Sequence, residues 1–301
     1  MKRAIARLLA TAALLAVSPA LFTEKASAAP ADVTPTDPKA GPESLAAGPD
    51  GTLYLGSISS LVVSRARPGE TVARPFIDLS ADKGAFLLGV MVDAPTNSLW
   101  VCEMMNMDRS SPLLKGKGVL RSFDLNSGAH KLNLPLPGDT NICNDFVIGP
   151  DKALYLSDTS NGKVLRLKPG ANAFETVIQN SSLYGIDGIT FLDGQLYVNT
   201  VWSNALFRIP LDAAGKAGDP QQLLTNVLLK APDGMRAANG KLYLAEGGNH
   251  QVDLVTIKGD RATITPLKTG LNAPTAVEVH GDVLWVGDRG GAKAVAVQLK
   301  K

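Results

Sequence analysis

The chain has 301 residues, of which 45% are hydrophobic and 19% are charged, and it contains 3 histidines and 2 cysteines. This ordinary globular composition excludes a disordered chain, a collagen-like fibre and a small disulfide-rich scaffold. At roughly 150 residues per domain the length suggests two domains, although all-β barrels and propellers of this length often form a single unit.

The first 28 residues have the pattern of a secretory signal peptide. Basic residues come first, an apolar stretch runs from Leu8 to Val17, and Ala26-Ser27-Ala28 places small residues where a signal peptidase cleaves. The apolar stretch is shorter than the roughly 20 residues of a membrane-spanning helix. We therefore expect cleavage after Ala28, no membrane anchor, and a periplasmic or secreted protein.

The charge of the remaining chain is close to zero. Residues 1–28 hold four of the 30 basic residues and one of the 28 acidic residues, which leaves a net charge of −1 over residues 29–301. This part of the sequence has no basic run with interleaved aromatics, the pattern typical of nucleic-acid binding. We expect a monomer that binds a small molecule and no nucleic acid.

A short phrase of leucine, an aromatic ring, and leucine or valine recurs along the chain. Each copy follows a turn signal and, before it, another apolar run, which is typical of a β-hairpin. Successive copies are 46, 55, 42, 46 and 42 residues apart. The copies are Leu53-Tyr54-Leu55, Leu99-Trp100-Val101, Leu154-Tyr155-Leu156, Leu196-Tyr197-Val198, Leu242-Tyr243-Leu244 and Leu284-Trp285-Val286.

These six repeats predict a six-bladed β-propeller. Each repeat has room for about four short strands, and the six units nearly fill residues 29–301 without a long helical period. We expect one all-β domain over that range. The last repeat ends after Val295-Ala296-Val297 without an outer strand, which we expect residues 31–36 to supply.

The residue that opens the innermost strand of each blade should lie at one mouth of the central channel. Aligning the hairpins places an acidic or amide side chain there in four blades. An Asp-Gly or Asn-Asp pair is by itself an ordinary turn signal, but its recurrence at the same phase favours a site. The six positions are Glu43, Leu88, Asn144, Asp187, Asp233 and Thr275.

Three carboxylates that converge on one axis repel one another unless a counter-ion neutralises them. Glu43, Asn144, Asp187 and Asp233 offer only oxygen donors, which suit a hard cation, and a wide, flexible ring favours Ca²⁺ over Mg²⁺. Zinc is not expected, because no His or Cys occupies the ring. We predict that these four residues bind Ca²⁺ or another divalent cation.

These residues resemble the senescence-marker-protein/gluconolactonase (regucalcin-like) family of six-bladed propellers. Glu43, the pair Asn144-Asp145 and the pair Asp233-Gly234 are similar, in blade order, to that family's metal-binding Glu, Asn and Asp. The wider group of calcium-dependent lactonases and phosphotriesterases includes paraoxonases and strictosidine-synthase-like proteins, and Gly41-Pro42-Glu43-Ser44 looks more like the latter branch. Asp187-Gly188 departs from the family's usual Asn-Gly.

The resemblance implies a hydrolase in which the metal polarises an ester or lactone carbonyl that water attacks. Asp233 is similar to the family's general base and would activate that water. The extra carboxylate of Asp187 would tighten cation binding and weaken Lewis acidity. The alternative is a non-catalytic propeller that binds a ligand or protein and uses the cation only for its structure, because one fold hosts many functions.

The 55-residue interval is about ten residues longer than the others, and the surplus lies in residues 104–118. We expect this insertion to overhang the metal, with Met105 and Met107 in an adaptable apolar wall. A surface loop packed against blade three is an equal alternative. Trp202 and His250 reach the same face from blades four and five, where they would shape a pocket for a small, partly apolar substrate.

Two further sets of residues gather near this mouth. Cys102 ends the second strand of blade two and Cys143 precedes the first strand of blade three, so a disulfide is expected in an oxidising compartment, although two separate buried thiols fit nearly as well. Asp158, Glu246 and Asp288 end second strands, where we expect bonds to neighbouring loops rather than a part in catalysis.

Overall fold

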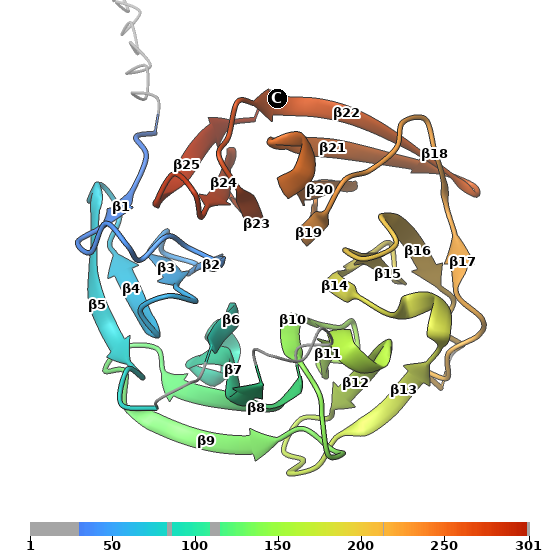
Figure 1. The fold of residues 1–301 in the computed structure, drawn as a ribbon, viewed down its shortest axis with the longest axis horizontal. Helices are drawn as coiled ribbons and strands as arrows, with labels where there is room; N and C mark the ends of the chain where they lie inside the picture. The colour runs from blue at the N-terminus through green and yellow to red at the C-terminus, as the bar shows by residue number, and fades with distance from the viewer. Residues whose placement is uncertain (1–29, 83–85, 109–114, 213, 300–301) are drawn as a thin grey trace, which may run out of the picture.

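Six β-sheets surround a central channel in the computed structural model of the protein (Figure 1). The structure describes residues 30–82, 86–108, 115–212 and 214–299, which form one all-β domain, and the predicted six-bladed propeller is confirmed. Within these residues no helix is long and apolar enough to cross a membrane. The expected signal peptide, residues 1–28, lies outside the described residues.

The strands of each blade follow one another outward from the channel in chain order. In blades one to three they are β2 (Ser44–Ala47), β3 (Leu53–Gly56), β4 (Val62–Ala66) and β5 (Val72–Asp78); β6 (Phe86–Asp93), β7 (Ser98–Asp108), β8 (Lys115–Asp124) and β9 (His130–Pro135); and β10 (Cys143–Ile148), β11 (Leu154–Asp158), β12 (Lys163–Leu167) and β13 (Glu175–Gln179).

Blades four to six are built in the same way, and β23, β24 and β25 form the last sheet. Their strands are β14 (Ile186–Leu192), β15 (Gln195–Thr200), β16 (Ala205–Ile209) and β17 (Gln221–Gln222); β19 (Pro232–Ala238), β20 (Lys241–Glu246), β21 (Gln251–Lys258) and β22 (Arg261–Thr269); and β23 (Pro274–His280), β24 (Val283–Asp288) and β25 (Lys293–Gln298). The short strands β1 (Thr34–Pro35) and β18 (Leu224–Thr225) pair in parallel with β5 and β22. Short 3-10 turns are η1 (Ala94–Thr96), η2 (Thr159–Asn161), η3 (Ser181–Leu183) and η4 (Gly247–Asn249).

The repeated leucine–aromatic phrase lies in the second strand of every blade: β3, β7, β11, β15, β20 and β24. In β11, Leu154, Tyr155 and Leu156 are all buried, because each sheet packs between two others. One apolar cluster joins Tyr155 of blade three to Val198 of blade four. Burying one large apolar side chain contributes about 1.5–3 kcal/mol, so the interfaces between blades stabilise the ring.

The segment that closes the ring differs from the expected one. β1 extends the outer edge of blade one and does not form a fourth strand in blade six. Before β1, Val33 and Ala294 of β25 exchange two backbone hydrogen bonds of 2.9 and 2.8 Å. The Asp32 carboxylate accepts the Ala296 N–H at 3.1 Å, so a side chain takes the place of a strand at this edge. The segment still joins the first blade to the last.

Buried acidic side chains anchor the loops that lead into the first strands, as expected from their positions. Asp158 accepts the N–H of Ile142 at 3.0 Å, and Asp288 accepts the N–H of Ala273 at 2.8 Å. Glu246 accepts the N–H of Lys230 in the same way. These carboxylates therefore replace backbone carbonyls as hydrogen-bond acceptors where the chain enters each blade.

Blades two and five each bury an acid at the same position of the second strand, but the partner of that acid differs between them. In blade two, fully buried Glu103 pairs with Arg121 of the next strand, with 2.5 Å between Nε and Oε2. In blade five the strand register puts Asp253 where Arg121 lies in blade two, so two fully buried acids, Glu246 and Asp253, are neighbours. Gln251 donates to both, at 3.2 and 2.8 Å. Burial, followed by the hydrogen bond to Glu246, raises the pKa of Asp253 to about 8.

We predict that Asp253→Asn stabilises the protein at neutral and alkaline pH and leaves its stability nearly unchanged in acid. The carboxyl ionises near 3.8 in the unfolded chain and near 8 in the folded one. Folding therefore favours the protonated acid, and the wild type loses this stability as the pH rises between those two values. Melting temperatures at about pH 4, 6 and 8 test this, with exposed Asp139→Asn as the control. A difference from wild type that is constant with pH contradicts it.

Candidate functional site

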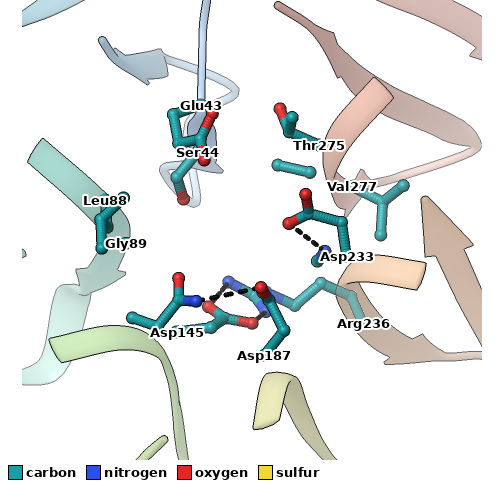
Figure 2. A pocket seen from close by; sticks show the side chains of 13 residues that line it. Glu43, Ser44, Leu88, Gly89, Asp145, Asp187, Asp233, Arg236, Thr275 and Val277 are labelled. Carbon is teal, nitrogen blue, oxygen red and sulfur yellow. Dashed lines mark hydrogen bonds and ion pairs between the residues drawn. The ribbon is translucent and has the colours of Figure 1, made fainter. Parts of the chain in front are cut away.

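The six ring positions expected from the repeat line one cavity in the channel: Glu43, Leu88, Asn144, Asp187, Asp233 and Thr275. Figure 2 shows Glu43, Asp187 and Asp233 pointing into the same space from three different blades. The cavity volume is about 20 Å³, which is room for about one water-sized sphere. The cavity therefore matches a single ion or water and is too small for the body of an organic substrate.

A β-bulge aims the ring residues at the channel. In five blades the pairing of the first two strands is irregular at the ring residue, as between Cys143 and Phe146 around Asn144. Such a bulge redirects a side chain away from the regular alternation of the strand. In blade one Glu43 lies just before β2, and its N–H donates to the Gly56 carbonyl at 2.8 Å. The sequence analysis did not find these bulges, of which the Asn-Asp and Asp-Gly pairs are the only trace.

The residue after the ring position is glycine in three blades, because the backbone of the next blade lies against it. A Cβ atom there would lie closer to a carbonyl oxygen of that blade than real side chains approach. Glycine thus brings the ring residues of neighbouring blades together. The contacts are Gly89 with the oxygen of Asn144 (2.1 Å), Gly188 with that of Asp233 (2.5 Å) and Gly234 with that of Thr275 (2.8 Å).

The ring carboxylates are crowded and desolvated. Burial, followed by the nearby charges of Asp145 and Glu43, raises the pKa of Asp187 to about 7. Burial and the charges of Asp187 and Glu43 raise the pKa of Asp233 well above its ordinary value, and these two carboxyls share a side-chain hydrogen bond. Asn144 Nδ2 donates to Asp187 Oδ2 at 3.0 Å. Ionising the whole ring is therefore costly unless a positive charge enters it.

Glu43 has its own positive partner. Arg289 Nη1 lies 2.5 Å from Glu43 Oε2, which opposes the effect of burial in raising the pKa of Glu43. As the side chains stand, no three His, Cys, Asp or Glu residues of the described chain form a group that could hold a metal ion. The donor set is nonetheless all oxygen, crowded and short of positive charge, which fits a hard cation once Glu43 is released from Arg289.

Arg236 fills the channel next to the ring, as Figure 2 shows. Its Nη1 and Nη2 bind the Asp145 carboxylate at 2.7 and 2.9 Å, and its Nε lies 3.6 Å from Glu278. Asp145 and Glu278 raise the pKa of this guanidinium further above its ordinary value, against the effect of burial. The sequence analysis missed Arg236, although an arginine three residues after Asp233 in the innermost strand β19 was a usable signal.

The residues expected to shape a substrate pocket lie outside this cavity. β7 and β8 extend as one hairpin through the insertion, with Met105 opposite Lys117, while residues 109–114 and the side chain of Met107 lie outside the described part. Trp202 is 46% exposed, and exposed His250 bonds through Nδ1 to the Asn272 carbonyl at 2.8 Å. Their part in substrate binding stays a prediction.

Cys102 and Cys143 form a disulfide, with 5.3 Å between their Cα atoms. The bond joins blade two to blade three, and Cys143 directly precedes the ring residue Asn144. Of the two alternatives left open by the sequence, the structure has the bridge. The disulfide ties the start of β10 to the middle of β7, because β7 continues to Asp108 and does not end at Cys102 as expected.

Comparison with known proteins supports the fold more than any one activity. Residues 29–59 match the family described as "Strictosidine synthase-like, N-terminal". This match covers the segment that contains Glu43 and leaves most of the chain unmatched. No curated protein matches the chain.

Solved propellers resemble the chain over most of its length. Virginiamycin B lyase from Staphylococcus aureus, in complex with quinupristin, is 13% identical with a TM-score of 0.63, over 89% of this chain and 98% of that one. A gluconolactonase candidate from a structural genomics consortium is 18% identical with a TM-score of 0.66, over 87% and 91%. Aldose sugar dehydrogenase from Streptomyces coelicolor, in its PQQ-bound form, is 17% identical with a TM-score of 0.60, over 89% and 95%. These likenesses show the fold.

We predict that Arg236→Gln destabilises the protein by about 3–5 kcal/mol, because removing one partner of a buried ion pair leaves Asp145 and Glu278 uncompensated. Urea unfolding measures the loss. Arg74→Gln, whose side chain is 64% exposed beside Glu70, is the control and should cost less than about 1 kcal/mol. An equal, small cost for both variants contradicts the structural role of Arg236.

Removing the disulfide should also lower stability. The bridge closes a chain segment of 41 residues, and the loss of such a constraint costs about 2–4 kcal/mol. We expect this change in the free energy of unfolding for the double variant Cys102→Ser/Cys143→Ser, and a similar one for the wild type under reducing conditions. Unchanged urea unfolding in both cases would show that the bridge contributes nothing.

Proposed function

We propose that the protein is an exported, cation-dependent hydrolase of a lactone or related ester, with Ca²⁺ as the preferred cation. The observation that carries this proposal is the convergence of four oxygen-bearing ring side chains, three of them with raised pKa values, on an ion-sized cavity. The gluconolactonase candidate and the strictosidine-synthase-like segment support the same class. Export rests on residues 1–28 alone.

Glu43, Asn144, Asp187 and Asp233 are the residues that would hold the cation. A bound divalent cation would supply Lewis-acid polarisation of a substrate carbonyl and compensate the ring charges. The residues of the chain would then orient the substrate and exclude bulk water from the site. Leu88, which is 9% exposed, is the one ring residue with an apolar side chain, and it lies between Glu43 and Asn144 of the neighbouring blades. That side of the site therefore has no competing acceptor.

Asp233 is the residue that we assign as general base. Burial and the charges of Asp187 and Glu43 raise its pKa in the cation-free ring. A bound cation would lower that pKa again, so the assignment rests on the place of Asp233 in the ring. The Gly234 N–H donates to Asp233 Oδ1 at 2.9 Å, which orients the carboxyl. The backbone carbonyl of Asp233 accepts a hydrogen bond from Asn199 Nδ2 at 2.6 Å. This bond holds the strand in place while the Asp233 carboxyl exchanges a proton with water.

The body of the substrate has to lie above the ring, because the cavity admits about one water-sized sphere. We infer that the body of the substrate lies among the loops that follow the second strands, where Trp202 and His250 are found. The β7–β8 hairpin extends from the same side. We propose that these residues, with Met105 and Met107, recognise a small, partly apolar ester.

The second candidate function is ligand or protein binding without catalysis. The pairing of Glu43 with Arg289 favours it, because this pair already compensates part of the ring charge without a metal. An auxiliary nutrient binding protein from Bacteroides thetaiotaomicron shares the fold, at 13% identity and a TM-score of 0.65 over 85% of this chain and 68% of that one. Propellers of this shape therefore serve both kinds of function.

We predict hydrolysis that needs both the cation and Asp233. A panel of lactones, aryl esters and phosphotriesters should include a substrate whose turnover is lost with a chelator and restored by added Ca²⁺. Asp233→Asn should lower kcat by about 100-fold or more, the usual contribution of a general base. Asp139→Asn, in an exposed loop, is the matched control and should retain wild-type kcat.

The outcomes separate the two candidates. Turnover that survives both chelation and Asp233→Asn overturns the proposed mechanism. Calcium binding without turnover of any member of the panel overturns the hydrolase and supports the binding protein.

A further inference from the structure

Arg289 is a positive charge held beside the ring carboxylates. Its guanidinium binds Glu43 at 2.5 Å, and its charge opposes the rise in the pKa of both Glu43 and Asp233. Arg236, the other arginine at the channel, is committed to Asp145 and Glu278. Arg289 is therefore the cationic side chain that compensates the ring carboxylates on the side of Glu43.

The backbone on both sides of this ion pair is fixed. The N–H of Arg289 donates to the Ala273 carbonyl at 2.9 Å, and the preceding Asp288 accepts the N–H of Ala273 at 2.8 Å. A Cβ atom at Gly41 would lie 2.1 Å from the Arg289 carbonyl oxygen, so glycine lets the loop before Glu43 pack directly on this residue. The two side chains are thus brought together by rigid neighbours.

The Glu43 and Arg289 side chains differ in how easily each can leave their ion pair. The Glu43 side chain is 15% exposed, whereas that of Arg289 is 42% exposed. The guanidinium donates to Glu43 through a single nitrogen, Nη1. The arginine can therefore turn into solvent when another positive charge replaces it at the largely buried Glu43. Glu43 stays at the start of blade one, where its N–H donates to the Gly56 carbonyl at 2.8 Å.

We propose, on the basis of the cation site proposed above, that Arg289 is a tethered counter-ion that a divalent cation displaces from Glu43. In the cation-free protein the guanidinium compensates Glu43 and stabilises the crowded ring. Cation binding breaks the ion pair and frees Glu43 to join Asn144, Asp187 and Asp233. Arg289 therefore lowers the affinity of the ring for the cation and sets the concentration at which the site fills.

Calorimetric titration of chelator-treated protein with Ca²⁺ tests this role without any substrate. Arg289→Gln should bind Ca²⁺ about 5- to 10-fold more tightly than wild type, because the competing charge is gone. Arg289→Lys keeps a charge and should stay near the wild-type Kd. Arg74→Gln removes an exposed arginine on blade one and should leave the Kd unchanged, which controls for net charge.

A second variant separates competition from a change in folding. In Glu43→Gln/Arg289→Gln the carboxylate is gone, so the gain in affinity should vanish although the same arginine is removed. Equal or weaker binding by Arg289→Gln than by wild type overturns the proposal and leaves the cation site standing. Absence of Ca²⁺ binding in the wild type and in both variants overturns the cation site itself. Tighter binding by Arg289→Gln and by the double variant alike also overturns the competition.

Discussion

The close approach of the innermost strands around the channel is the constraint on which the site depends. Three glycines directly after ring positions let one blade contact the carbonyls of the next. Bulges then turn the preceding side chains toward the axis. Side chains that are far apart in sequence consequently share a space of about 20 Å³. Without this spacing the same residues would be separate turn residues on separate hairpins.

Crowding these oxygens creates a charge problem that the chain meets in three ways. Arg236 is buried and permanently bound between Asp145 and Glu278. Arg289 is partly exposed and holds Glu43 from the solvent side. Asp187 and Asp233 have no arginine of their own, and burial together with neighbouring negative charges raises their pKa values, which favours their protonated forms. On the cation site proposed above, the last two arrangements are the ones that an entering cation would replace.

The periodic features could be predicted from sequence because they repeat. The leucine–aromatic phrase marks the second strand of each blade, and its phase locates Glu43, Asn144, Asp187 and Asp233 at one cavity. The bulges that were missed repeat in five blades but have no residue signature common to all of them. The missed ion pairs occur once each. Arg236 meets Asp145 across 91 residues and Arg289 meets Glu43 across 246, distances that no local pattern encodes. The closing segment was placed correctly only at Val33, which pairs with Ala294 of β25, because the chain then turns to pair with β5 of blade one.

The charge balance of the ring bears on both proposed functions, because the fold alone hosts an enzyme or a binding protein. The described side chains around the channel include the acids Glu43, Asp145, Asp187, Asp233 and Glu278 and two arginines. Fully ionised, this group carries an excess of three negative charges, which protonation of Asp187 and Asp233 would reduce to one. A divalent cation that enters would release those protons, since metal ligands bind in their deprotonated form. On the function proposed above, the cation that completes the charge balance would also lower the pKa of Asp233, the proposed base.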